Sequence, residues 1–134
     1  MYTTVALQLL TAAFHSLSFI MKEEPTNDTE KQLHELITTY SKDLGAGFHP
    51  TMMDIFLSLS ACFALLYLFG GLSNWFLMKK KTGSNIMKGI LNISLIVFGI
   101  CFVVMAFFTF LPPIACTGLV FIALIATRLT VPKG

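Results

Sequence analysis

The sequence predicts an all-α integral membrane protein, an antiparallel four-helix bundle with a short amphipathic helix in its first outer loop. Hydrophobic residues make up 55% of the 134-residue chain and charged residues only 12%, whereas a soluble domain has about 25% charged residues. Four long apolar stretches alternate with polar links, and basic and acidic residues fall into different links. The net charge of +2 gives no reason to expect nucleic-acid binding.

The four apolar stretches have the length of membrane spans, and one membrane domain covers residues 1–134. About 20 helical residues cross roughly 30 Å of hydrocarbon, and backbone amides in lipid must be satisfied within their own segment, which favours helices. The first stretch lacks the basic start of a signal peptide and contains Gln8 and His15, so we expect it to be retained as a helix. The predicted spans cover residues 2–21, 52–78, 86–111 and 114–131.

The distribution of charge predicts the orientation of the chain. Basic residues flank the inner ends of the spans: Lys79–Lys81, Lys88, Arg128 and Lys133. Six of the seven acidic residues lie in the link 22–51. Lysine and arginine are enriched in cytoplasmic links. An even number of spans places both termini on one side, so we expect cytoplasmic termini and an outer loop over 22–51 in a multi-pass protein of the cell membrane.

The outer loop contains a predicted amphipathic helix. Thr29 with Gln32 has the spacing of a capping box, and Asn27 with Glu30 is an alternative start. The glycines of segment 45–47 are expected to end the helix. Such a helix lies on the membrane surface or on the mouth of the bundle. It serves as a simple cover or as a lid over a cavity. Its apolar stripe is Leu33, Leu36, Ile37, Tyr40 and Leu44.

Small and polar residues recur on one face of each span, and they should face the bundle interior because polar groups avoid lipid. Pro112 and Pro113 are expected to form a tight outer turn, so that the last two spans pack as an antiparallel hairpin. The predicted inward stripes are Thr4, Gln8, Thr11, His15 and Ser18 in the first span, Asp54, Ser58, Ala61, Cys62, Gly70, Gly71 and Asn74 in the second, Asn85, Gly89, Asn92 and Gly99 in the third, and Cys116, Ala123, Thr127 and Thr130 in the fourth.

Depth along the spans suggests which polar residues meet. Gln8 and Asn92 each lie roughly 9 Å from the inner boundary, so we expect an interhelical hydrogen bond between them. Near the outer mouth, a second group of polar residues falls at similar depth. This candidate outer-mouth cluster comprises His15, His49, Asp54, Ser58 and Tyr40, with His34 as a further neighbour.

The outer-mouth cluster has three interpretations: metal or proton chemistry, a ligand pocket, or purely structural roles. Ionisable groups inside a membrane are costly and are often functional, and an Asp–His pair can relay a proton. Imidazoles with a carboxylate can also bind zinc or copper, but the chain has no HExxH motif and no closely spaced His pair on one helix, so we predict no metal site. Alternatively, Asp54 caps the second span, with His49-Pro50-Thr51 as the entry turn.

The segment Gly47–Ser58, with its aromatic, acidic and small polar residues, resembles the start of the second span in a family of small, uncharacterised four-span bacterial inner-membrane proteins. Members also tend to have a histidine near the outer end of the first span, where this chain has His15 followed by Ser16. The resemblance covers roughly residues 10–78, and Met53 stands where the family has an aromatic residue. It implies the four-span fold and the bacterial inner membrane, and it implies no activity or cofactor.

Two functional hypotheses follow. The first is a non-catalytic membrane protein that binds a small lipophilic ligand or packs as an accessory subunit against partner helices, including a second copy of itself. The second is a membrane enzyme or proton-coupled carrier that uses His15, His49 and Asp54; its catalytic residues and cofactors are not determined by the sequence. The phenylalanine-rich third span, with Phe98 and Phe102, is expected to form a lipid-facing or packing surface, or alternatively a lipophilic pocket.

Overall fold

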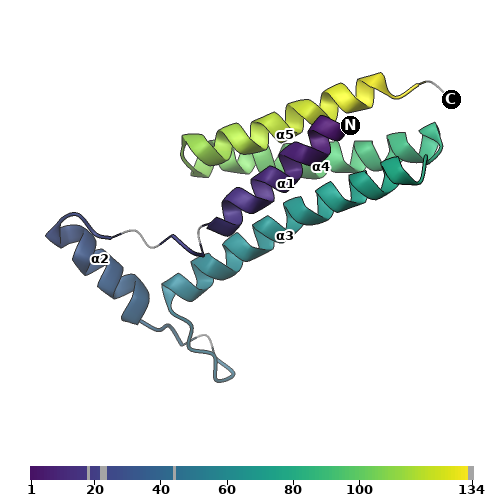
Figure 1. Ribbon diagram of the computed structural model, residues 1–134. Helices are drawn as coiled ribbons and strands as arrows, with labels where there is room; N and C mark the ends of the chain where they lie inside the picture. The colour runs from purple at the N-terminus through teal and green to yellow at the C-terminus, as the bar shows by residue number, and fades with distance from the viewer. Residues whose placement is uncertain (18, 22–23, 44, 133–134) are drawn as a thin grey trace. The chain divides into compact units, whose positions relative to one another are not determined.

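The computed structural model describes residues 1–17, 19–21, 24–43 and 45–132, and these residues form an all-helical chain (Figure 1). The only pairing of extended backbone among them is an isolated bridge between Ser41 and Thr51. The predicted fold class, all-α, is therefore confirmed. The helices are α1 (Tyr2–Leu17), α2 (Asp28–Thr39), α3 (Met52–Lys79), α4 (Ser84–Phe108) and α5 (Leu111–Thr130).

Among the described residues, three helices are long and apolar enough to cross a membrane, namely α3, α4 and α5. Their bounds agree with the predicted spans to within three residues. The first helix has 16 residues and ends at Leu17, not at Met21 as expected. The chain tightens there into a turn, in which the Phe19 N–H donates to the Ser16 carbonyl and the Met21 N–H to the Leu17 carbonyl.

The chain forms two compact units. Unit 1 comprises Met1–Ala12 and Leu66–Gly134, and unit 2 comprises Ala13–Leu65. Both α1 and α3 therefore contribute residues to each unit. In unit 1, the first part of α1 contacts two other helices: the Thr4 hydroxyl donates to the Ala123 carbonyl of α5 at 3.1 Å, and the Asn74 side chain of α3 donates to the Gln8 side chain at 2.9 Å.

Aromatic contacts complete the ring of neighbouring helices in unit 1. The Tyr67 ring of α3 lies 4.9 Å from the Phe98 ring of α4, and the Phe102 ring of α4 stacks on the Phe121 ring of α5 at 6.0 Å. Figure 1 shows α4 and α5 running side by side. The helical segments thus follow one another around unit 1 in the order α1, α3, α4, α5.

The ends of these helices define a common end of unit 1. Met1, Ser84 and Thr130 line one small cavity of about 370 Å³. The start of α1, the start of α4 and the end of α5 are therefore close together. The core between them is formed by Tyr67, Leu91, Phe98, Val120 and Leu124, together with the buried polar residues Thr4, Gln8, Asn74 and Thr117.

The predicted inward faces are correct for parts of α1 and α3. They are wrong for α4 and for the first part of α3, where Asp54, Ser58 and Cys62 are exposed. Thr4, Gln8 and Thr11 of α1 are buried, as are Gly70, Gly71 and Asn74 of α3. In α4, by contrast, Asn85, Gly89 and Asn92 are exposed, and the buried face is formed by Met87, Leu91 and Phe98. Asn92 lies on the opposite, exposed side, where its side-chain oxygen accepts a hydrogen bond from Arg128 Nε of α5 at 2.7 Å.

The connection between α4 and α5 also differs from the expectation. Pro112 and Pro113 do not form the turn; they lie in the first turn of α5, and Thr109 and Phe110 form the link. Proline suits the first helical turn, because its fixed φ is helical and the N–H that it lacks has no partner there in any case. The turn is therefore displaced towards the N-terminus relative to the prediction.

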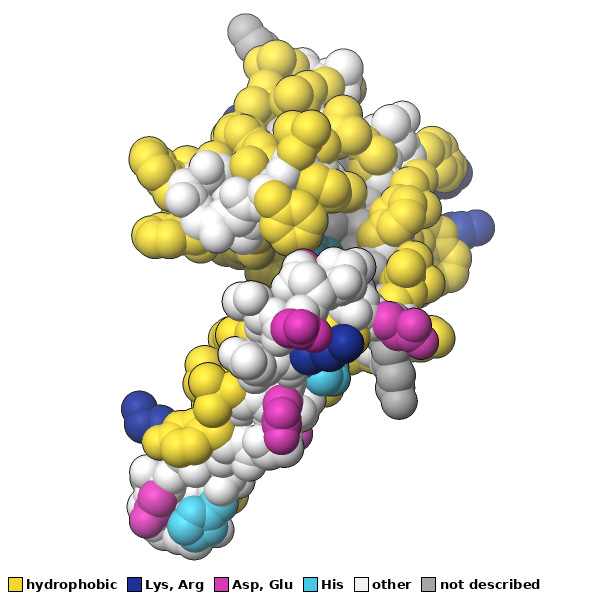
Figure 2. All heavy atoms as spheres, turned by 90° about the vertical axis from the view of Figure 1, so that its left-hand side faces the viewer, with side chains coloured by type: hydrophobic (Ala, Val, Ile, Leu, Met, Phe, Trp, Pro, Cys, Tyr) yellow, Lys and Arg dark blue, Asp and Glu magenta, His cyan; other side chains and the backbone are white. Residues whose placement is uncertain are grey.

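Unit 2 contains α2, whose start is set by its sequence. Asn27 is the N-cap: its side-chain oxygen accepts from the Glu30 N–H at 2.9 Å, and the Glu30 carboxylate accepts in return from the Thr26 N–H at 2.6 Å. Of the two predicted starts, the one at Asn27 is thus correct. No residue of α2 is buried. Figure 2 shows acidic side chains gathered on this part of the chain, beside exposed apolar side chains.

The end of α2 lies earlier than predicted. The helix stops at Thr39, where the Thr38 and Thr39 hydroxyls bond back to the His34 and Glu35 carbonyls at 2.7 Å, and Leu44, the last residue of the predicted stripe, lies outside the described residues. The segment 45–47 does not end the helix. It forms a turn with positive φ at all three residues, a conformation in which glycine is favoured.

Candidate functional site

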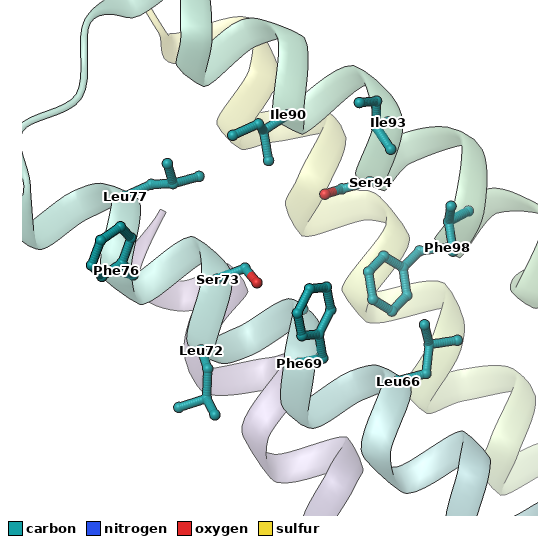
Figure 3. Close-up of a pocket in the computed structure, with 12 residues that line it drawn as sticks. Leu66, Phe69, Leu72, Ser73, Phe76, Leu77, Ile90, Ile93, Ser94 and Phe98 are labelled. Atoms are coloured by element: carbon teal, nitrogen blue, oxygen red, sulfur yellow. The ribbon is translucent and has the colours of Figure 1, made fainter.

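The candidate site is an apolar groove between α3 and α4 in unit 1. It has a volume of about 680 Å³, within the range of about 300–1,000 Å³ that is typical of ligand pockets. Figure 3 shows Phe69 and Ser73 of α3 and Ser94 and Phe98 of α4 in the space between the two helices. The lining is formed by Leu66, Phe69, Gly70, Leu72, Ser73, Phe76 and Leu77 of α3 and by Ile90, Ile93, Ser94, Val97 and Phe98 of α4.

Helical spacing explains why these residues share the groove. Positions three and four apart lie on the same face of a helix. Phe69, Ser73 and Leu77 follow this spacing on α3, and Ile90, Ser94 and Val97 follow it on α4. The two faces meet because the helices are held together at Tyr67 and Phe98.

Gly70 permits the close contact at the base of the groove. A Cβ atom at this position would lie 2.7 Å from Gln8 Nε2 and 2.7 Å from Phe98 Cζ. Such distances are far below van der Waals contact, so a larger residue would displace both neighbours. Gly70 thus allows the buried side chains of α1 and α4 to approach the α3 backbone, and this approach sets the shape of the groove wall.

Two serines provide the polar groups of the groove. The hydroxyls of Ser73 and Ser94 lie in the space between α3 and α4 (Figure 3). Neither hydroxyl forms a hydrogen bond with any residue in the described part of the chain. A hydroxyl without a partner in an apolar environment costs about 1–3 kcal/mol, so each is an available donor and acceptor for a bound molecule.

The sequence alone did not identify these groove residues, apart from Phe98. The phenylalanine-rich third span was interpreted mainly as a lipid-facing or packing surface, and the structure divides it: Phe98 lines the groove, Phe102 packs on Phe121, and Phe107 is 79% exposed. The signal that could have located the site is the matched pattern of one serine among large apolar residues on each of two successive helices.

In the predicted outer-mouth cluster, Asp54 takes part in the start of α3. Its carboxylate accepts from the Thr51 N–H at 2.9 Å and from the Thr51 hydroxyl at 2.8 Å, and the Asp54 N–H donates to the same hydroxyl at 3.2 Å. This is the reciprocal arrangement of a capping box. Ser58 lies one turn further on, where its hydroxyl donates to the Asp54 carbonyl at 2.7 Å.

The other members of the cluster lie in different surroundings. His15 is half-buried and its ring meets the Phe63 ring edge-on at 4.6 Å. His49 and Tyr40 are exposed. Within the described ranges, no group of three or more His, Cys, Asp or Glu side chains is close enough to hold a metal ion. Convergence of the five residues on one cavity stays a prediction.

The predicted pair of Gln8 and Asn92 takes a different form. Gln8 bonds to Asn74, whereas Asn92 bonds to Arg128. Gln8 is 0% and Asn74 is 1% exposed, so their hydrogen bond is fully buried. The two amides therefore have other partners than the sequence predicts, because Asn92 lies on the exposed face of α4.

The comparisons with known proteins add no identification. No family model matches the chain, and no curated protein and no solved structure matches it. The resemblance to small four-span inner-membrane proteins therefore stays a prediction.

Proposed function

We propose that this protein is a multi-pass protein of the cell membrane with four spans, cytoplasmic termini and α2 on the outer surface. Three helices have the length and composition of spans. At 16 residues, α1 is only about 24 Å long, but its first part is a member of the helix ring in unit 1. Its start lies beside the end of α5, as shown by the 2.7 Å contact between the Thr4 and Thr127 hydroxyls.

The function that the geometry supports best is non-catalytic binding of a lipophilic molecule in the groove between α3 and α4. The observation that supports it is the combination of an apolar lining with two unused hydroxyls, those of Ser73 and Ser94. An elongated apolar molecule with one hydroxyl or carbonyl group matches this lining. The volume of about 680 Å³ is that of a small-molecule pocket, and it supports a small ligand as the occupant.

The alternative function, an enzyme or proton-coupled carrier based on His15, His49 and Asp54, has less support. Both hydrogen bonds accepted by the Asp54 carboxylate come from Thr51, so its position is explained by helix capping. The bacterial inner membrane, as the specific location, is part of the proposal and is supported by the sequence resemblance.

The test is a binding measurement on the purified full chain in detergent. Oleyl alcohol and octadecene, which differ by one hydroxyl, are titrated while bound molecules are counted by native mass spectrometry. We expect tighter binding of the alcohol, loss of binding in Ser94→Phe, which fills the groove, and about two- to tenfold weaker alcohol binding in Ser94→Ala.

Ala126→Phe is the matched control, because Ala126 is exposed on α5 and lies outside the groove lining. It adds a side chain of the same size and should leave binding unchanged. Equal binding by Ser94→Phe and the wild type would refute the proposal. A co-purifying membrane protein that is lost in Ser94→Phe would assign the groove to an accessory subunit instead.

A further inference from the structure

Unit 1 has an excess of positive charge, and no acidic side chain of its own balances it. Six of the nine Lys and Arg residues lie in Met1–Ala12 and Leu66–Gly134, whereas all seven Asp and Glu residues lie within 23–54 and so belong to unit 2. Unit 1 therefore contains no carboxylate side chain. The one ion pair found among the described residues, Lys31 with Asp28 on α2, also lies outside unit 1.

One of these cations, Arg128, is held in a defined geometry on the exposed side of α4 and α5, away from the core of unit 1. Arg128 Nε donates to Asn92 Oδ1 at 2.7 Å. This bond fixes the guanidinium plane, while its two Nη groups form no hydrogen bond within the described ranges. Arginine presents paired donors in a rigid fork that matches phosphate oxygens, so the free edge of Arg128 is preorganised to bind an anionic oxygen pair.

A second cation and open space lie on the same face. Lys88 precedes Asn92 by one helical turn and so shares its face of α4. It forms no ion pair or hydrogen bond with a described residue. Gly89 neighbours Asn92 at a spacing of three residues, and a Cβ atom there would meet no atom within 4 Å, so the backbone is open to an approaching group.

This face lies towards the basic end of unit 1. Arg128 is in the last turn of α5, and the end of α5 adjoins the start of α4 at the cavity lined by Ser84 and Thr130. Lys79–Lys81 precede that start in the chain. This inference rests on the proposed membrane placement. In that placement, the basic end of unit 1 lies at the depth of the lipid phosphates in the cytoplasmic leaflet.

We infer that Arg128, Asn92 and Lys88 form a binding site for the phosphate of an anionic phospholipid headgroup. Arg128 Nη1 and Nη2 donate to the phosphate oxygens, Asn92 positions the guanidinium, and Lys88 adds a second positive charge. The site is separate from the proposed groove, because none of the three residues lines it. Each basic residue near an anionic membrane surface strengthens binding by about fivefold.

Native mass spectrometry tests this site with phosphatidylglycerol and phosphatidylcholine of identical acyl chains, titrated onto the full-length protein in detergent. We expect the wild type to prefer phosphatidylglycerol, and Arg128→Gln and Lys88→Gln each to lower that preference by about fivefold. Asn92→Leu keeps every charge and should reduce the preference less. Lys31→Gln removes one positive charge from α2 and is the matched control, with no expected change.

Three results would overturn the inference. The first is equal binding of the two lipids by the wild type, and the second is an unchanged preference in Lys88→Gln. The third is displacement of phosphatidylglycerol by an equal concentration of glycerol phosphate, which would indicate a site for free phosphates. A dimer that is lost in Arg128→Gln, with lipid preference unchanged, would assign the face to a second copy of the chain. Lys88 forms no hydrogen bond or ion pair with a described residue, so Lys88→Gln should fold normally. Its lipid preference therefore tests the inference even if Arg128→Gln does not fold. Ser94→Phe separates the two proposals, since it should abolish groove binding and leave the headgroup preference intact.

Discussion

Gln8 and Asn74, which are 66 residues apart in the chain, form a fully buried hydrogen bond of 2.9 Å between α1 and α3. In the described structure the second polar atom of each amide, Gln8 Nε2 and Asn74 Oδ1, has no hydrogen-bond partner. Exchanging the oxygen and nitrogen positions of both amides leaves the same number of groups unpaired. The bond is therefore the specific polar link that fixes the position of α1 against α3.

Removing one amide of this pair should destabilise the protein. Gln8→Leu leaves both polar atoms of Asn74 buried and unpaired, which costs about 1–3 kcal/mol of unfolding free energy. The double variant Gln8→Leu/Asn74→Leu should recover part of this loss, because both partners are then apolar. Equilibrium unfolding in mixed micelles measures both effects. Asn85→Leu, at an exposed position on α4, is the control and should have little effect; an equally large loss there would contradict the assignment.

Substitution of two glycines should have opposite effects. Gly70→Ala places a methyl group 2.7 Å from Gln8 Nε2 and from Phe98 Cζ, and such overpacking costs about 1–3 kcal/mol. Gly89→Ala meets no atom within 4 Å and should be neutral or stabilise α4 by up to about 1 kcal/mol. The same unfolding measurement compares the two. If Gly70→Ala were as stable as Gly89→Ala, the close packing at the base of the groove would be refuted.

The stability of the start of α2 should fall at low pH. The Thr26 N–H, and then the Thr26 hydroxyl, donate to the Glu30 carboxylate and hold the pKa of Glu30 below its ordinary value of 4.5. Because the pKa is lower in the folded state than in the unfolded state, the stabilising contribution is present in full above pH 4.5 and is lost as the pH falls through the lowered pKa. The Thr26 amide resonance in an NMR titration should report this step, and Glu30→Gln should abolish it. A step at or above pH 4.5 would show that the bond does not form.

If Asp54 acts as a capping residue, its effect should depend on Thr51. Thr51→Ala and Asp54→Asn should each weaken hydrogen-exchange protection in the first turn of α3, and the double variant should lose little more than either single one. Lipophile binding in the groove should be unaffected by all three variants. Loss of a transport or catalytic activity in Asp54→Asn, with the protection of that turn unchanged, would favour the carrier or enzyme hypothesis.

Much of this fold could be predicted because apolar length is a local property of the sequence. The bounds of α3 were predicted to within one residue, and the burial of Thr4 and Gln8 was predicted from periodicity alone. The rotation of α4 was not predicted, because α4 buries its large apolar residues Leu91 and Phe98 instead of its small and polar stripe, and Asn92 bonds to Arg128 on the exposed side. The groove was not predicted either, because Ser73 and Ser94 come from different helices and their proximity depends on how those helices pack at Gly70.

The most direct test of the account is the accessibility of single cysteines, in a chain whose native cysteines are replaced, to a membrane-impermeant thiol reagent in intact cells. We expect Glu35→Cys on α2 to be labelled from outside, whereas Lys80→Cys and Tyr2→Cys should be labelled only after the membrane is permeabilised. Labelling of Lys80→Cys and Glu35→Cys from the same side would contradict the membrane placement. Labelling of Tyr2→Cys from outside would reduce the number of spans to three.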